Sequence, residues 1–161
     1  MLQKTTYLLF SVFLSMVSPD VLEAQEPTVI SWDVLADVTY TEQYDESLQA
    51  YWLVPEFGSR PRRFAGKEVV LMGYFIPFNL DSEFYVLSRF PYSNCFFCGG
   101  AGPETVLELQ FKKPPSKLQM DKKYFFRGTL ALNNDDFEHC NYILKNAALI
   151  TEDEVWQIKK Q

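Results

Sequence analysis

Apolar and aromatic residues gather in five runs along the second half of the chain. The third run alternates most clearly, with Leu107, Leu109 and Phe111 on one face. Turn residues bound each run, and β-branched or aromatic residues over this length are typical of strands. The pattern therefore predicts five β-strands, over residues 67–78, 83–90, 104–111, 124–132 and 141–150.

Two of these runs contain a glycine near their middle, Gly73 in the first and Gly128 in the fourth. A glycine inside a long strand often marks a bulge or a bend at a barrel corner. Closing the sheet on itself would also remove exposed edges from such apolar strands. The sequence thus predicts a mainly β fold, a small five-stranded OB-like barrel over residues 66–150.

The segments on either side of the barrel are predicted to carry little regular structure. Residues 25–65 form an N-terminal extension, in which Ser31 is the expected N-cap of a short helix. Residues 40–65 are expected to be mostly irregular, because proline and glycine interrupt them (Pro55, Gly58, Pro61). Residues 151–161 form a C-terminal tail, where a capping box starting at Thr151 predicts a short helix.

The first residues have the order of a secretory signal peptide. Lys4 precedes an apolar run over residues 7–17, and Ser18 and Pro19 break that run before Ala24. A membrane span needs about 20 apolar residues, and this run is shorter. We therefore expect residues 1–24 to be a leader cleaved near Ala24, which exports the protein to the periplasm or the extracellular space. An uncleaved N-terminal anchor is the alternative.

Charge limits the partners that the chain can bind. The formal net charge is -6, whereas binding to phosphate backbones or anionic lipids needs clustered Lys and Arg. We therefore expect no nucleic-acid partner. No stretch after the leader resembles a membrane span, so no transmembrane domain is expected in the mature chain.

The main candidate for chemistry is a cysteine loop between the second and third predicted strands. Cys95 and Cys98 lie in a CxxCG motif, flanked by aromatic residues and followed by further glycines. Cys140 is the third cysteine, so the three thiols cannot all pair within one molecule. Such a loop can hold a metal, close a small disulfide or take part in thiol redox chemistry.

A metal site would use Cys95, Cys98, Cys140 and His139 as ligands. The CxxCG motif has the geometry of one zinc knuckle, whereas structural zinc usually takes four ligands. Cys140 and His139 are the soft candidates for the missing positions. Zinc is the first expectation, and cuprous copper, which accepts two or three thiolates, is the second.

Two other interpretations of the loop stay open. In an oxidising compartment, Cys95 and Cys98 can form a structural disulfide that stiffens the loop. Alternatively, they serve a thiol–disulfide oxidoreductase, with Cys95 as nucleophile and Cys98 as resolving thiol. A redox CxxC usually opens a helix, and the glycines from Gly99 onward oppose one.

Three segments carry a resemblance to a known family. They read FAGKEVVLMGYFIP over residues 64–77, FYVLSRFPY over residues 84–92 and CFFCGGAGPE over residues 95–104. Over residues 30–150, the chain resembles a family of uncharacterised exported bacterial proteins, a domain of unknown function. The resemblance implies an OB-like barrel with a CxxCG loop and export, and it implies no particular activity.

The sequence therefore predicts an exported binding module rather than an enzyme. No catalytic motif of the serine hydrolase, phosphate-loop or dinucleotide type occurs. The cysteine loop is expected to bind a metal ion or a protein partner. Its aromatic residues are expected to cap the barrel end, with an apolar recognition patch for a partner as the alternative (Phe90, Tyr92, Phe96, Phe97).

Overall fold

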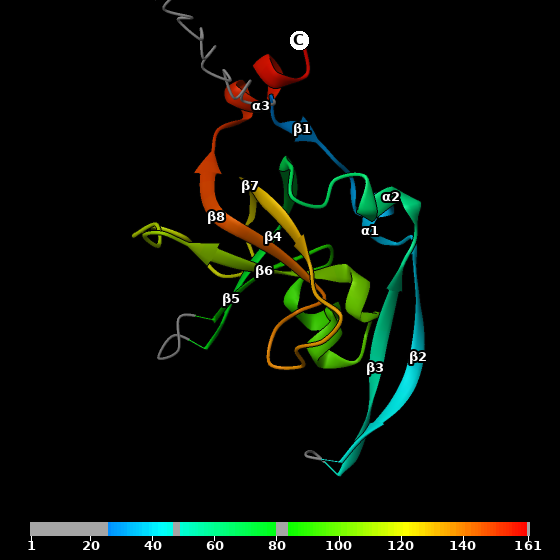
Figure 1. Ribbon diagram of the computed structural model, residues 1–161. Helices are drawn as coiled ribbons and strands as arrows, with labels where there is room; N and C mark the ends of the chain where they lie inside the picture. Colours follow the sequence, from blue (N-terminus) through cyan, green and yellow to red (C-terminus); the bar gives the residue numbers. More distant parts are fainter. Residues whose placement is uncertain (1–25, 47–48, 80–83, 161) are drawn as a thin grey trace, which may run out of the picture.

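Five strands close into a β-barrel. The computed structural model describes residues 26–46, 49–79 and 84–160. The barrel strands are β4 (Glu68–Asn79), β5 (Phe84–Ser88), β6 (Val106–Phe111), β7 (Lys123–Leu132) and β8 (Tyr142–Ile150). They follow the order β4-β5-β6-β8-β7, and β7 pairs back to β4 (Figure 1). β6 and β8 pair in parallel, and the other barrel pairs are antiparallel. The five predicted strands and the OB-like barrel are confirmed.

The two mid-strand glycines lie where the barrel is too crowded for a side chain. A Cβ at Gly73 would come within 2.7 Å of both the Leu87 Cγ atom and the Ser88 carbonyl oxygen. A Cβ at Gly128 would come within 2.8 Å of Leu144, and the register of β7 against β8 shifts there. Because glycine has no side chain, the first and fourth strands can bend at these two crowded positions as the barrel closes.

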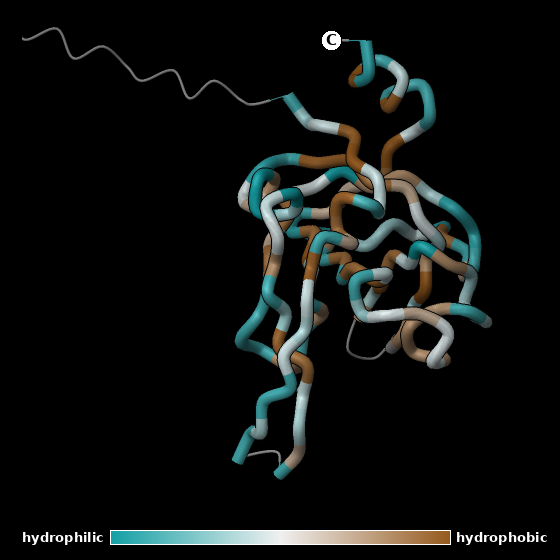
Figure 2. The backbone as a smooth tube through the Cα atoms, turned by 90° about the vertical axis from the view of Figure 1, so that its right-hand side faces the viewer, coloured by the Kyte–Doolittle hydropathy of each residue, from teal (hydrophilic) through white to brown (hydrophobic). Residues whose placement is uncertain are grey.

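The barrel interior forms the main hydrophobic core. Leu71, Phe126, Leu130 and Leu144 are fully or almost fully buried there. Figure 2 shows the apolar segments concentrated in the barrel. Burial on this scale supplies most of the favourable free energy of folding.

The N-terminal segment seals one side of the barrel. β1 (Thr28–Val29) pairs in parallel with β4, and α1 (Trp32–Leu35) follows it, with Ser31 at the N-cap as predicted. Leu35 is completely buried in the core, and its carbonyl accepts a 2.6 Å hydrogen bond from the Tyr142 hydroxyl. α2 (Ser59–Arg62) comes just before the barrel.

A two-stranded hairpin projects from the barrel as an arm (Figures 1 and 2). It consists of β2 (Val38–Asp45) and β3 (Ala50–Phe57), paired antiparallel. The sequence predicted mostly irregular chain over residues 40–65, because Pro55 interrupts it. The structure instead accommodates Pro55 within β3, opposite Tyr40. A proline is tolerated in a strand when its missing N–H would have pointed away from the ladder.

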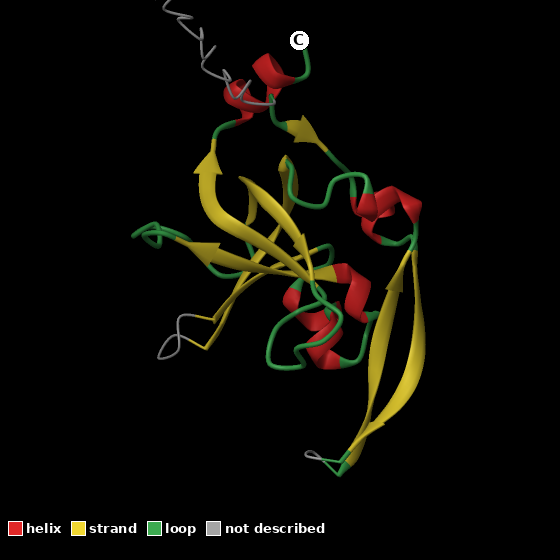
Figure 3. Cartoon of the chain, in the orientation of Figure 1, coloured by secondary structure: helices red, strands yellow, loops and turns green. Residues whose placement is uncertain are grey.

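Short helices complete the fold (Figure 3). Three 3₁₀ turns, η1 (Tyr92–Asn94), η2 (Phe96–Cys98) and η3 (Pro103–Thr105), form the cysteine loop. The predicted C-terminal helix is α3 (Glu152–Ile158), and its capping box at Thr151 is present. α3 lies at the opposite end of the molecule from the tip of the hairpin.

Two expectations concern membranes and export. In the part of the chain that the structure describes, no helix is long and apolar enough to span a bilayer. The predicted leader, residues 1–24, lies outside the described residues.

Candidate functional site

A pocket of about 560 Å³ opens where the cysteine loop, the β7–β8 loop and the hairpin meet. This volume falls within the range of about 300–1,000 Å³ that is usual for ligand sites. Most of the lining is apolar or aromatic. The lining residues are Trp52, Leu53, Phe78, Phe84, Phe96, Phe97, Pro103, Val106, Phe137, Glu138, His139, Cys140 and Asn141.

Stacked aromatic rings form the wall on the side of the cysteine loop. The ring centroids of Phe78 and Phe97 are 4.3 Å apart, and those of Phe96 and Phe97 are 5.4 Å apart. Phe96 and Phe97, for which a recognition patch was the alternative to a cap over the barrel end, both line the pocket. Phe90 and Tyr92 are exposed and do not belong to its lining.

The hairpin supplies the opposite wall. The Trp52 ring of β3 meets the Phe137 ring edge-on, with centroids 6.3 Å apart. Leu53, the next residue of β3, also lines the pocket and is nearly half exposed. This wall was not expected from the sequence, because residues 40–65 were predicted to be mostly irregular. The continuous apolar and aromatic run over residues 50–54 (AYWLV) was the available signal.

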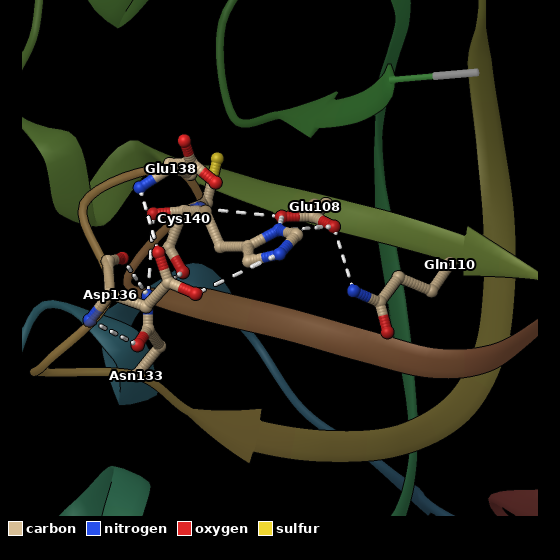
Figure 4. A network of polar contacts seen from close by, with 7 residues as sticks. Glu108, Gln110, Asn133, Asp136, Glu138 and Cys140 are labelled. Carbon is tan, nitrogen blue, oxygen red and sulfur yellow. Dashed lines mark hydrogen bonds and ion pairs between the residues drawn. The ribbon is translucent and has the colours of Figure 1, made fainter. Parts of the chain in front are cut away.

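A buried carboxylate holds the polar edge of the pocket in place. This edge consists of the polar lining residues Glu138, His139, Cys140 and Asn141. Glu108 of β6 is only 4% exposed. Its Oε2 atom lies 2.8 Å from His139 Nδ1 and accepts from the Cys140 backbone N–H at 3.3 Å, and its Oε1 accepts from Gln110 at 2.8 Å (Figure 4). A buried carboxylate is tolerated only when its oxygens are satisfied in this way. The network therefore fixes both His139 and Cys140 against the barrel.

Asn133 shapes the loop between β7 and β8 from within. Its side-chain amide donates to the Asp136 carbonyl at 2.6 Å, and its oxygen accepts from the Asp136 N–H at 3.1 Å. The same amide reaches the carbonyls of His139 and Cys140 at 3.3 Å. Because Asn133 is itself buried, this polar edge is held in one arrangement before any ligand arrives.

The two cysteines of the CxxCG motif differ in exposure. Cys95 is fully buried beside Ile76, Val86 and Val106, whereas Cys98 is exposed. Partial desolvation and the neighbouring Cys95 thiol raise the pKa of Cys98 above its ordinary value. A catalytic cysteine needs the opposite shift, because the thiolate is the nucleophile.

Cys140 packs against the cluster that contains Cys95. Burial and then the charge of Glu108 raise the pKa of the Cys140 thiol to about 12. His139 is bound to Glu108 rather than to a cysteine. Within residues 26–46, 49–79 and 84–160, no group of three or more His, Cys, Asp or Glu side chains is arranged to hold a metal ion. The four-ligand site stays a prediction.

The fold and the site together define a small OB-like barrel with an apolar pocket at its rim. No family model matches the chain. No curated protein matches it either. Among solved structures, it is similar to a DUF3299 family protein from Pseudomonas aeruginosa PAO1, at 14% identity and a TM-score of 0.48. The match covers 78% of this chain and 97% of that one. At this level of similarity, no function is transferred from that neighbour.

Proposed function

We propose that this protein is an exported, non-enzymatic binding module whose pocket takes an apolar segment of a partner protein. The observation that carries the proposal is the pocket itself, with its aromatic walls and a fixed polar edge. A mostly apolar pocket with a few convergent polar groups is the default candidate for a binding site in a structure.

The exposed side chains around the pocket support a macromolecular partner. Phe78, Phe137 and Leu53 line it, and each is nearly half exposed. Exposed aromatic and aliphatic groups gathered around one cavity are typical of protein-binding surfaces. The cysteine loop contributes one wall, which agrees with the expectation of a partner at this loop.

The chemistry of the thiols favours binding over redox catalysis. The alternative enzyme would use Cys95 as nucleophile, and that residue is fully buried. The raised pKa values of Cys98 and Cys140 also keep these thiols protonated near neutral pH.

Metal binding by the cysteine loop is a second candidate, and the contact between Cys95 and Cys98 favours it. Two thiols suit cuprous copper better than structural zinc, which usually needs four ligands. Elemental analysis of protein purified without chelator tests this candidate. A copper content near one equivalent, lost in Cys98→Ser, is the expected result, and a metal-free protein contradicts it.

The partner-binding proposal is tested by selecting random displayed peptides on the immobilised protein. Enriched peptides should lose about tenfold in affinity for Phe97→Ala, the usual loss when one buried aromatic anchor is removed. Trp156→Ala is the matched control, because Trp156 is an exposed aromatic residue on α3. A library that yields no enriched peptide, or peptides that bind both variants equally, would falsify the proposal.

A further inference from the structure

We infer that the partner segment is an extended strand rich in Lys or Arg among apolar residues, and that it pairs with the free edge of β3. This inference rests on the proposed function and specifies how the pocket is used. Three observations carry it: the unpaired backbone of β3, the position of the pocket along that edge, and the charge around the pocket.

The ladder of the hairpin shows which backbone groups point away from β2. The Gly58 N–H donates to the Asp37 carbonyl at 2.7 Å, just beyond the paired residues. Antiparallel pairs alternate between hydrogen-bonded and non-hydrogen-bonded positions. Counting along the register, the pairs of Pro55, Leu53 and Tyr51 with β2 are non-hydrogen-bonded. The N–H and C=O groups of Tyr51 and Leu53 therefore point to the outer edge of β3.

Among the described strands, β3 pairs with β2 alone. Its other edge is available to an extended peptide, which is the usual route of strand addition. Pro55 lies near the base of the hairpin, so strand addition would begin beyond it, at Leu53 and Tyr51. Figure 1 shows β3 on the side of the hairpin that faces the barrel.

The pocket follows this edge rather than one face of the hairpin. Trp52 and Leu53 are neighbours in β3, so their side chains point to opposite faces. Both nevertheless line the pocket. An added strand would therefore lie between β3 and the Phe97 wall, and its apolar side chains would enter the pocket.

Charge around the site selects a cationic strand. The lining residues in the described part of the chain include Glu138 and no Lys or Arg. Asp135 and Asp136 lie in the same loop. From Val38 to Ser59 the sequence has four acidic residues and no basic one (Glu42, Asp45, Glu46, Glu56). Complementary charge would speed association and suppress acidic competitors.

The same charge argues against a second copy of this chain as the occupant. Pairing two hairpins edge to edge would bring two acidic segments side by side with no basic residue in either to neutralise them, and this repulsion opposes the pairing. A dimer formed through β3 is therefore one of the outcomes that contradict the inference.

The charge argument is tested with three synthetic peptides of equal length, in which valine and phenylalanine alternate with lysine, glutamine or glutamate. Fluorescence anisotropy at low salt should show the lysine peptide binding about tenfold more tightly than the glutamate peptide, with a smaller gap at high salt. Asp135→Asn combined with Glu138→Gln should reduce this preference. The matched control is Glu152→Gln with Asp153→Asn on α3, whose acidic residues lie away from the pocket.

The edge argument is tested at Tyr51. Tyr51→Ala removes the side chain and keeps the outward N–H, whereas Tyr51→Pro also removes that N–H. The proline variant should bind the lysine peptide about tenfold more weakly than the alanine variant, with unfolding curves confirming that both are folded. Gln43→Ala, which changes β2 and leaves β3 intact, is the control and should leave the affinity for the lysine peptide unchanged.

The two proposals fail in different ways. If library-selected peptides bind but charge and the Tyr51 N–H make no difference, the cationic strand is overturned and the apolar pocket stands. The same holds if none of the three synthetic peptides binds while selected ones do. If the library itself yields nothing, both proposals fall. If the protein dimerises and Tyr51→Pro abolishes the dimer, the occupant of the β3 edge is a second copy of this chain, and the cationic strand is overturned.

Discussion

The barrel and the hairpin are both built from aromatic and β-branched residues, and they use them in opposite ways. In the barrel, Phe126 is fully buried and each strand pairs on both sides. In the hairpin, Tyr44 is 54% exposed and Tyr51 is 70% exposed, although the centroids of their rings lie only 5.2 Å apart. The difference separates burial, by which the barrel stabilises the fold, from exposure, by which the hairpin presents the surface proposed to bind a partner.

The base of the hairpin, unlike its outer half, is buried against the barrel. Phe57 is buried and packs on Tyr142 with centroids 5.3 Å apart. The apolar surface then continues outward to Leu53 and Tyr51, which are exposed. An isolated two-stranded hairpin is only marginally stable in water, so anchoring at its base lets the outer half stay ordered and accessible.

The largest expected effect is in the barrel core. Phe126→Ala should lower the free energy of unfolding by about 3–5 kcal/mol, because it leaves a cavity among fully packed side chains. Urea unfolding followed by fluorescence measures this loss. A decrease no larger than that of a hairpin variant would show that the barrel is not the main source of stability.

A smaller loss is expected where two barrel strands approach most closely. Gly73→Ala should cost about 1–3 kcal/mol, because the new methyl group would collide with Leu87 and a backbone oxygen. Met72→Ala, at a neighbour in β4 that is 40% exposed, is the control in the same denaturation assay. Equal effects of the two substitutions would contradict the crowding.

The boundary between barrel and pocket should show a pH dependence through Cys140. Its pKa rises from 9.0 to about 12 on folding, so the folded protein keeps a proton that the unfolded chain loses. The associated stability is complete below pH 9.0 and is lost as the pH rises toward 12. Cys140→Ala should flatten this decline by up to about 1.4 kcal/mol per pH unit. Tyr40 and Tyr142, whose pKa values are also raised by burial, are present in both the unsubstituted protein and Cys140→Ala. Parallel curves of unfolding free energy against pH for these two proteins would therefore show that Cys140 does not cause the decline.

The smallest effect is expected at the tip of the hairpin. Tyr51→Ala should lower the free energy of unfolding by about 0.2–1 kcal/mol, the usual value of one cross-strand aromatic pair. Thermal unfolding of this variant beside Phe126→Ala measures the comparison directly. A loss of several kcal/mol would place the outer hairpin within the structural core.

The barrel could be predicted because its strands are long, apolar and bounded by turn residues, and because Gly73 and Gly128 mark its bends. The hairpin could not, since Pro55 normally ends a strand. A strand tolerates a proline only when the proline nitrogen faces the unpaired edge, and the sequence alone does not show which edge it faces. The pairing of Glu108 with His139 was likewise hidden. It joins residues on β6 and the β7–β8 loop, and only the crossover of the barrel brings them together.

The position of β8 has a consequence for how the chain folds. β8 is the last strand in the sequence, and it lies between β6 and β7 in the sheet. Until it arrives, both of these strands keep an open edge and Glu108 has no histidine beside it. A chain that emerges from its N-terminus onward therefore cannot complete its barrel before nearly all of it has been delivered. Such non-local closure tends to be slow, and it favours an all-or-none final step.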